Sequence, residues 1–232
     1  KIADATDPIK GQTGGKTFTL TQNVDNIQGT NGDDTIIAGP GPAGGVHTLG
    51  ASDVINGGGG NDKIIITSQA PGAGENLVPR ITSVEQVFIQ AVGVGATNVN
   101  MINATGSKEV WSDNSTGNVF VTNLREKATI GVKGGNGANV MVVQAAAPAL
   151  AGDLAVALNG ANANALGVNA TGLPGAAGYT STTINTTVGN DAITGRAGTQ
   201  TSQLGTLDVG NALNKVTVTG DGAVRVVSNL AD

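Results

Sequence analysis

The chain has 232 residues, with 37 glycines, no cysteine, one histidine and a formal net charge of −5 at pH 7. The acidic balance argues against a nucleic-acid-binding protein, because no basic stripe is present to meet phosphates, and the lack of cysteine excludes disulfides and thiolate metal sites. No apolar run is long enough to insert into a membrane. Charged residues are scarce, but valine, isoleucine and threonine are frequent, which favours short strands and Gly/Asn turns over disorder.

Two nine-residue segments near the N-terminus share one template, G-G-x-G-x-D-x-U-x, in which U is a large apolar residue. Residues 57–65 fit it at every defined position, and residues 29–37 fit it with Thr30 in place of the second glycine. This nonapeptide is typical of calcium-binding parallel β-rolls. Its glycines allow φ > 0, so that carbonyl oxygens can converge, and its aspartate adds a hard carboxylate ligand. The alternative is that these are ordinary Gly/Asn hairpin turns.

The apolar position of this template recurs at Ile9, Phe18, Ile27, Ile36, Val46, Ile55 and Ile64, with one extra residue absorbed in the turn-rich segment 39–45. If each nonapeptide makes a half-turn, alternate repeats stack on one edge. One edge then carries Asp7, Asp25, Gly44 and Asp62, and the other carries Lys16, Asp34 and Asp53. We expect calcium between Asp7 and Asp25 and between Asp34 and Asp53, with Lys16 able to replace an ion beside Asp34.

The first 68 residues are therefore predicted to form an RTX-like calcium-binding β-roll, and residues 76–232 a β-rich structural domain. Short β segments recur about every ten residues, which indicates a solenoid, sandwich or barrel. Their expected ranges are 81–89, 99–102, 109–111, 119–121, 128–132, 140–143, 182–188, 207–209, 215–219 and 224–227. Asn/Thr-rich ladders favour the solenoid.

Three later segments complete the prediction along the chain. Residues 159–178 are rich in glycine, alanine and asparagine and are expected to be a long loop or insertion. Asp191 lies in a partial repeat of the motif, as a turn residue or a weaker calcium ligand. Residues 220–222, Gly-Asp-Gly, carry a hairpin turn signal.

The sequence offers little for catalysis. His47 is the only histidine, no G-x-S-x-G elbow accompanies it, and the acidic residues cluster in turn motifs. Trp111 and Tyr179 are too few for a sugar-stacking platform, and Trp111 is expected in the core. We therefore expect a protein that is not an enzyme.

Residues 15–21, 24–36 and 49–62 resemble a segment that recurs in bacterial surface-layer (S-layer) proteins, and residues 81–87, Ile-Thr-Ser-Val-Glu-Gln-Val, resemble the segment that follows there. The overall similarity is to Caulobacter-type S-layer proteins with RTX-type calcium repeats. The resemblance maps the calcium ligands to the carboxylates of Asp25, Asp34, Asp53 and Asp62 and to turn carbonyls at Gly29, Asn31, Gly57 and Gly59. Thr30, Lys16 and the Gly/Pro insertion depart from the family pattern and affect the expected number of ions.

The resemblance implies an extracellular protein of the bacterial cell surface, exported by a type I system, whose subunits join into a two-dimensional lattice when calcium binds. A cell-surface polysaccharide, contacted through another part of a longer protein, is a further expected partner. The predicted fold is all-β, a short calcium β-roll followed by a β-solenoid or sandwich-like region. RTX-type repeats also occur in secreted adhesins and enzymes, so a module of a large adhesin and the export domain of a type I-secreted enzyme stay open as alternatives.

Overall fold

The structure is a computed structural model that describes residues 14–41, 46–69, 74–145, 152–168, 179–187, 202–209 and 213–226. Asp7, Gly44 and Asp191 lie outside these residues, as does part of the predicted insertion, residues 169–178. The described chain is all-β and forms a parallel β-solenoid of about 7 turns, which confirms the predicted fold class. It contains no helix that could cross a membrane.

Three parallel sheets form the walls of the solenoid. Sheet A contains, in spatial order, β1 (Thr17–Thr19), β3 (Thr35–Ala38), β5 (Lys63–Ser68), β8 (Gln86–Ala91), β11 (Glu109–Asp113), β13 (Thr129–Lys133), β15 (Asp153–Asn159), β17 (Ser181–Thr187) and β19 (Lys215–Gly220). Sheet C contains β6 (Glu75–Leu77), β9 (Thr97–Asn100), β12 (Val119–Leu124), β14 (Val140–Ala145), β16 (Asn162–Val168), β18 (Ser202–Asp208) and β20 (Val224–Val226). The small sheet B contains β2 (Asn26–Gln28), β4 (Val54–Asn56), β7 (Arg80–Thr82) and β10 (Asn103–Thr105).

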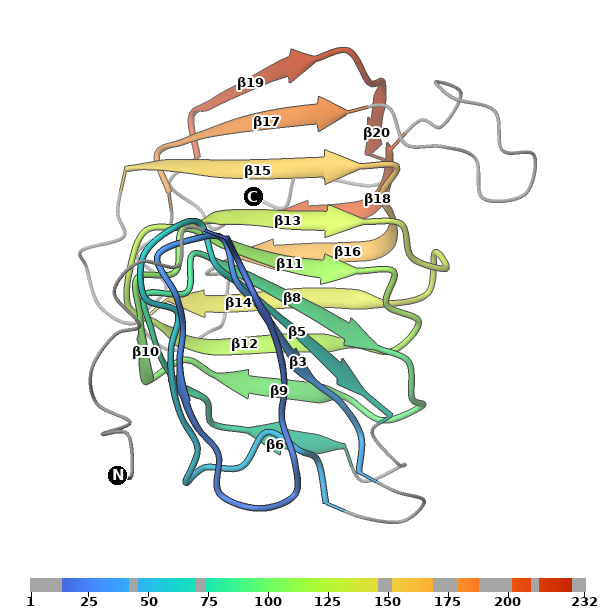
Figure 1. The fold of residues 1–232 in the computed structure, drawn as a ribbon. Coiled ribbons are helices and arrows are strands. Elements are labelled where there is room, and N and C mark those ends of the chain that lie inside the picture. The colour runs from blue at the N-terminus through green and yellow to red at the C-terminus, as the bar shows by residue number, and fades with distance from the viewer. Residues whose placement is uncertain are drawn as a thin grey trace, which may run out of the picture.

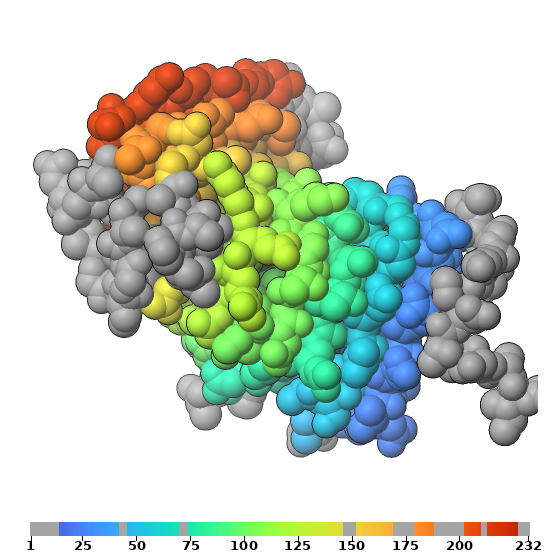
Figure 2. Space-filling view, turned by 90° about the vertical axis from the view of Figure 1, so that its left-hand side faces the viewer, coloured from blue at the N-terminus to red at the C-terminus, as the bar shows by residue number. Residues whose placement is uncertain are grey.

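β1 to β4 alternate between sheets A and B, and from β5 to β10 the chain visits sheets A, C and B in turn, rising by one strand per coil. Figure 1 shows sheets A and C as two stacks whose strands point in opposite directions, with β10 at one side between them. Figure 2 shows the coils following one another from the N-terminal to the C-terminal end. Sheet B ends at β10, so the later coils have two walls instead of three. Sheet A passes without a break across the predicted domain boundary, because β5 pairs with both β3 and β8.

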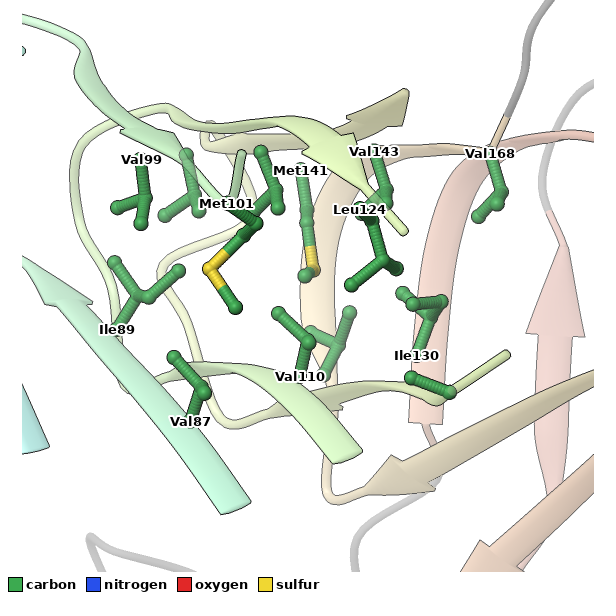
Figure 3. Close-up of a cluster of buried hydrophobic side chains, with 14 of the residues drawn as sticks. Val87, Ile89, Val99, Met101, Val110, Leu124, Ile130, Met141, Val143 and Val168 are labelled. Carbon is green, nitrogen blue, oxygen red and sulfur yellow. The ribbon is translucent and has the colours of Figure 1, made fainter. Parts of the chain in front are cut away.

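The core lies between the walls and follows from the two-residue period of the strands. Register-matched residues of sheet A form one buried column, namely Ile36, Ile64, Val87, Val110, Ile130, Val156 and Ile184. In Figure 3, Val110 and Ile130 from sheet A and Met141 and Val143 from sheet C fill the same interior. Each such side chain contributes about 1.5–3 kcal/mol through burial.

Three sequence predictions are wrong. Residues 220–222 do not close a hairpin, because β19 pairs with β17 and β20 pairs with β18 in parallel; this glycine-rich segment is a corner of the solenoid. Residues 162–168 of the predicted insertion form β16, paired on both sides. Trp111 lies half-buried on the outer face of sheet A, because its neighbour Val110 takes the inward position, and it stacks on Phe88 with ring centroids 6.0 Å apart.

Candidate calcium site

The strand registers decide which aspartates meet. Thr35 pairs with Lys63 and Asn26 pairs with Val54. Both pairs are 28 residues apart, so the turn before each strand stacks on the turn 28 residues later. Asp34 therefore lies over Asp62, and Asp25 over Asp53. The predicted pairing of Asp34 with Asp53 is wrong.

The cause lies between β3 and β4, where the described residues 39–41 and 46–53 contain no strand. Val46, the expected member of the series, is 78% exposed. The buried His47 anchors this connection, with Nε2 3.0 Å from the carbonyl oxygen of Thr67. Its Nδ1 accepts the backbone N–H of Leu49 at 2.9 Å, so the ring is neutral and carries its proton on Nε2. The only histidine of the sequence thus has a packing role in the described structure.

Three carboxylates follow one another along the solenoid at the entry to sheet A, and we call them the acidic column: Asp34, Asp62 and Glu85. The backbone N–H of Asp34 donates to Asp62 Oδ1 at 2.7 Å, and that of Asp62 donates to Glu85 Oε2 at 2.8 Å. Asp34, Asp62 and Glu85 are 1%, 0% and 9% exposed, respectively. A buried row of three carboxylates is costly unless positive charge compensates it.

Lysines occupy the register positions at both ends of the acidic column. Lys108 Nζ lies 3.9 Å from Glu85 Oε1, although the lysine side chain is largely exposed. At the other end Lys16 reaches Asp34 through its backbone N–H, at 2.6 Å from Oδ1. The predicted Lys16–Asp34 salt bridge is not among the ion pairs of the described residues.

The first glycine of each stacked turn gives the carboxylate its space. A Cβ atom on Gly29 would overlap the carbonyl oxygen of Gly57 and lie 2.6 Å from Asp34 Oδ2. A Cβ atom on Gly57 would overlap the carbonyl oxygen of Ser83 and Asp62 Oδ2. In both turns a carboxylate oxygen and a carbonyl oxygen of the next coil therefore border the same small space, which suits the oxygen ligands that calcium prefers.

The two aspartates differ in how their oxygens are satisfied. Asp34 Oδ2 accepts the backbone N–H of Thr30 at 2.6 Å and lies 3.1 Å from its hydroxyl. Asp62 Oδ2 is buried and has no hydrogen-bond partner within the described structure. Burial, and next the negative charges of Asp34, Glu85 and Asp33, raise the pKa of Asp62 to about 6, against the lowering effect of the Asp34 N–H. At neutral pH the Asp62 carboxylate is charged, and it forms no ion pair among the described residues.

The second pair of aspartates is held by backbone donors. Asp53, which is 2% exposed, accepts the N–H of Asp25 at 2.9 Å on Oδ1 and that of Gly50 at 2.7 Å on Oδ2. Asp25 accepts the N–H of Thr21 at 2.7 Å. In the next coil the register places Pro79 at this position, so the pair has no third carboxylate. Asp25 and Asp53 therefore act as turn-capping groups in this structure.

The structure brings most of the remaining predicted ligands to the same two turns. Gly59 donates its N–H to the carbonyl oxygen of Thr30 at 2.9 Å, and Asn31 lies against it at the tip of the stack. No three His, Cys, Asp or Glu side chains of the described residues converge on one point. A cation here would need backbone carbonyls in addition to carboxylates, and the predicted turn carbonyls of Gly29, Asn31, Gly57 and Gly59 lie on the turns that could supply them.

Sequence reasoning missed Glu85. It is the last residue of a shortened turn, residues 83–85, that matches no nonapeptide, but it stands two residues before the buried Val87, as Asp62 stands before Ile64. Ser83 takes a positive φ of 49°, which L-residues seldom adopt. A search for glutamate in place of aspartate in this half of the motif would have found the third member of the column.

Residues 21–41 and 46–65 match the family model described as the RTX calcium-binding nonapeptide repeat (4 copies). The matched residues contain β2, β3, β4, the start of β5 and both stacked turns. The chain thus carries RTX repeats, which are calcium-binding motifs and form a parallel β-roll. Such a roll is a structural module rather than a catalytic one, and RTX repeat proteins are typically secreted and extracellular. Comparisons with curated proteins and with solved structures give no match.

Proposed function

We propose that this chain is a structural module of a bacterial surface layer, which folds when calcium binds outside the cell and then self-assembles into a two-dimensional lattice. The observation that carries the proposal is the stack of two RTX turns, with Asp34 over Asp62, at the start of a continuous solenoid. The calcium-dependent fold is the chemical part of the proposal, and the lattice is the structural part.

Calcium couples to folding through the acidic column. Without a cation the buried carboxylates of Asp34, Asp62 and Glu85 repel one another and oppose formation of the first coils. A cation bound between the turns would offset this repulsion, so its binding free energy would become folding free energy. Extracellular calcium modules bind at about 10⁻⁴–10⁻³ M. The roll would thus stay unfolded at the low calcium of the cytosol, suited to export, and fold outside.

Self-association is supported by the coil of β19 and β20, the most C-terminal coil among the described residues. Val216 and Val218 of β19 continue the inward-facing positions of sheet A, but they are 39% and 52% exposed, whereas Ile184 in the coil before is 2% exposed. Within the described part of the chain, β19 pairs with a strand on one side only. An open strand edge beside exposed apolar residues is suited to pairing with a second copy.

The adhesin alternative rests on a different feature, the stack of Phe88 and Trp111 on the outer face of sheet A. Stacked aromatic rings of this kind can receive the face of a sugar ring. Tyr179 does not contribute, because it is buried in the core. Binding of bacterial or host glycans that is lost in Trp111→Ala, without any assembly in calcium, would favour this function over the surface layer.

The deciding experiment compares the chain in EGTA and in millimolar calcium by circular dichroism, light scattering and electron microscopy. Calcium should raise the β content and drive reversible formation of two-dimensional sheets. Folding without assembly would transfer support to the adhesin or export-domain function. If calcium left both fold and size unchanged, the calcium-dependent function would be wrong.

A further inference from the structure

One buried carboxylate oxygen in the acidic column points to a cation site that extends past the residues matching the RTX repeat. Asp62 is 0% exposed, and its Oδ2 has no hydrogen-bond partner within the described structure. Its counterpart Asp34 Oδ2 accepts the N–H of Thr30, but the equivalent residue of the next turn, Gly58, donates its N–H to Asn56 Oδ1 at 3.1 Å instead. The second turn therefore leaves one charged oxygen without a donor, and it does so on the side of the following coil.

The following coil presents oxygen atoms to this place. A Cβ atom added to Gly57 would overlap both Asp62 Oδ2 and the carbonyl oxygen of Ser83, so these two oxygens face one small space. The positive φ of Ser83, 49°, gives residues 83–85 the tight turn that places Glu85 next in the column. The same relation holds one coil earlier, where the carbonyl oxygen of Gly57 and Asp34 Oδ2 border the space beside Gly29.

We propose that Asp62, the Ser83 carbonyl and Glu85 form a further site for a hard divalent cation, at the junction between the RTX turns and the rest of the solenoid. Glu85 lies outside the residues that match the repeat family. Two carboxylates and a carbonyl are the ligand types that calcium takes, and the bound cation would balance the buried negative charge. The site rests on the proposed calcium-dependent fold and extends it past the last nonapeptide.

Lys108 indicates that no further ion binds in the coil after Glu85. Its Nζ lies 3.9 Å from Glu85 Oε1, and Lys108 follows Glu85 in the register of sheet A. An ammonium group at this position takes the place of a cation in the next coil. The acidic column therefore ends at Glu85, and the proposed ion is the last of the series.

The test is isothermal titration of the EGTA-stripped chain with calcium chloride, with circular dichroism in saturating calcium as the check of folding. Glu85→Gln should bind one ion fewer, or bind that ion on the order of 10–100-fold more weakly. Glu109→Gln is the matched control, because Glu109 lies one coil further in the same sheet and accepts the indole N–H of Trp111 at 2.8 Å. It should bind calcium as the unmodified chain does.

Asp34→Asn distinguishes the ion beside Asp34 from the proposed ion beside Asp62 and Glu85. It should weaken a different ion from the one lost in Glu85→Gln, and the double variant should lose both. The inference is overturned if Glu85→Gln binds the same number of ions with the same affinity as the unmodified chain, or if the two variants lose the same ion. If the unmodified chain binds no calcium, the proposed function itself fails.

Lys108→Gln keeps the inference testable should Glu85→Gln not fold. Removing the exposed ammonium group frees Glu85 Oε1, so the weakest ion should bind about two- to fivefold more tightly at low salt. An unchanged affinity in Lys108→Gln, with Glu85→Gln unfolded in calcium, would count against a ligand role for Glu85.

Discussion

Replacing Asp62 by asparagine should stabilise the chain without calcium and reduce the stabilisation that calcium provides. The pKa of Asp62 is raised from 3.8 to about 6 in the folded chain. Since one pKa unit corresponds to about 1.36 kcal/mol, the charged carboxylate costs the fold about 3 kcal/mol at neutral pH. Asparagine removes this cost, keeps an oxygen for the N–H of Asp34, and places an amide donor near the carbonyl of Ser83.

The sign of the pH dependence follows from the same shift. Between pH 3.8 and pH 6 the folded chain binds a proton at Asp62 that the unfolded chain has lost, so this group lowers the unfolding free energy as pH rises through that window. Below the window both states are protonated and the cost disappears. Above it the full cost persists until a cation binds.

Calcium should oppose this cost with a free energy of similar size. At a calcium concentration 100-fold above the dissociation constant, one site contributes about 2.7 kcal/mol. In urea unfolding followed by far-ultraviolet circular dichroism, the asparagine variant should have the higher midpoint in EGTA at neutral pH, and the difference should shrink or reverse in calcium. Asp153→Asn, at an exposed position in β15, is the control and should change neither midpoint. An asparagine variant that is no more stable than the unmodified chain in EGTA would refute the reasoning.

Three further substitutions test the rest of the structure. Gly131→Ala should destabilise the fold by about 1–3 kcal/mol and alter the fluorescence of Trp111, because the added methyl group would overlap the indole ring. His47→Leu should cost about 1–3 kcal/mol in thermal or urea unfolding, since it removes the contact to the carbonyl of Thr67 and leaves a backbone amide unpaired. Val218→Lys should abolish calcium-driven assembly in light scattering while the fold persists, because this side chain is 52% exposed at the last coil.

Each of these variants has a neighbour that serves as its control. Gly39→Ala meets no atom within 4 Å and should be neutral, in contrast to the alanine at position 131. Val46→Ala, at a side chain that is 78% exposed, should leave the connection before β4 intact. Thr217 pairs with the exposed Thr183 and so lies on the opposite face of β19 from Val218; Thr217→Lys should still assemble. Equal effects in a variant and its control would contradict the corresponding interpretation.

The nine-residue period predicted the first coils well, because it records which side chains face the interior. Ile36, Ile55 and Ile64 are all fully buried, as their places in the template require. The same period could not tell how the coils stack. It counted Val46 as a member of the series, whereas the packing of His47 against β5, a contact between residues distant in sequence, folds that segment into a connection. One missing half-turn is enough to exchange the partners of every later aspartate.

The candidate site was predictable to the extent that a motif defines it. The motif and the family resemblance predicted Asp34 and Asp62 as calcium ligands, and the structure places both on the two stacked turns. Glu85 could not be found in this way, since its turn is shortened and its partner Asp62 is 23 residues earlier in the sequence. The outward position of Trp111 also escaped composition arguments, because a large aromatic ring beside Gly131 covers the sheet surface without entering the core.

The order of the strands in sheet A, in which each coil touches the one before it and the one after it, makes this molecule a one-dimensional system of coupled units. In such an array each coil is stabilised directly only by its neighbours. A ligand bound at one coil therefore stabilises a distant coil only through the interfaces between them, and a weak interface reduces this effect. Calcium bound at the first coils would therefore fold this end of the solenoid first, and folding would then proceed from coil to coil toward the C-terminal side. The coil of β19 and β20, the farthest from the RTX turns in the described structure, would become ordered after the coils between them, and a second molecule packed against it would stabilise it from the other side.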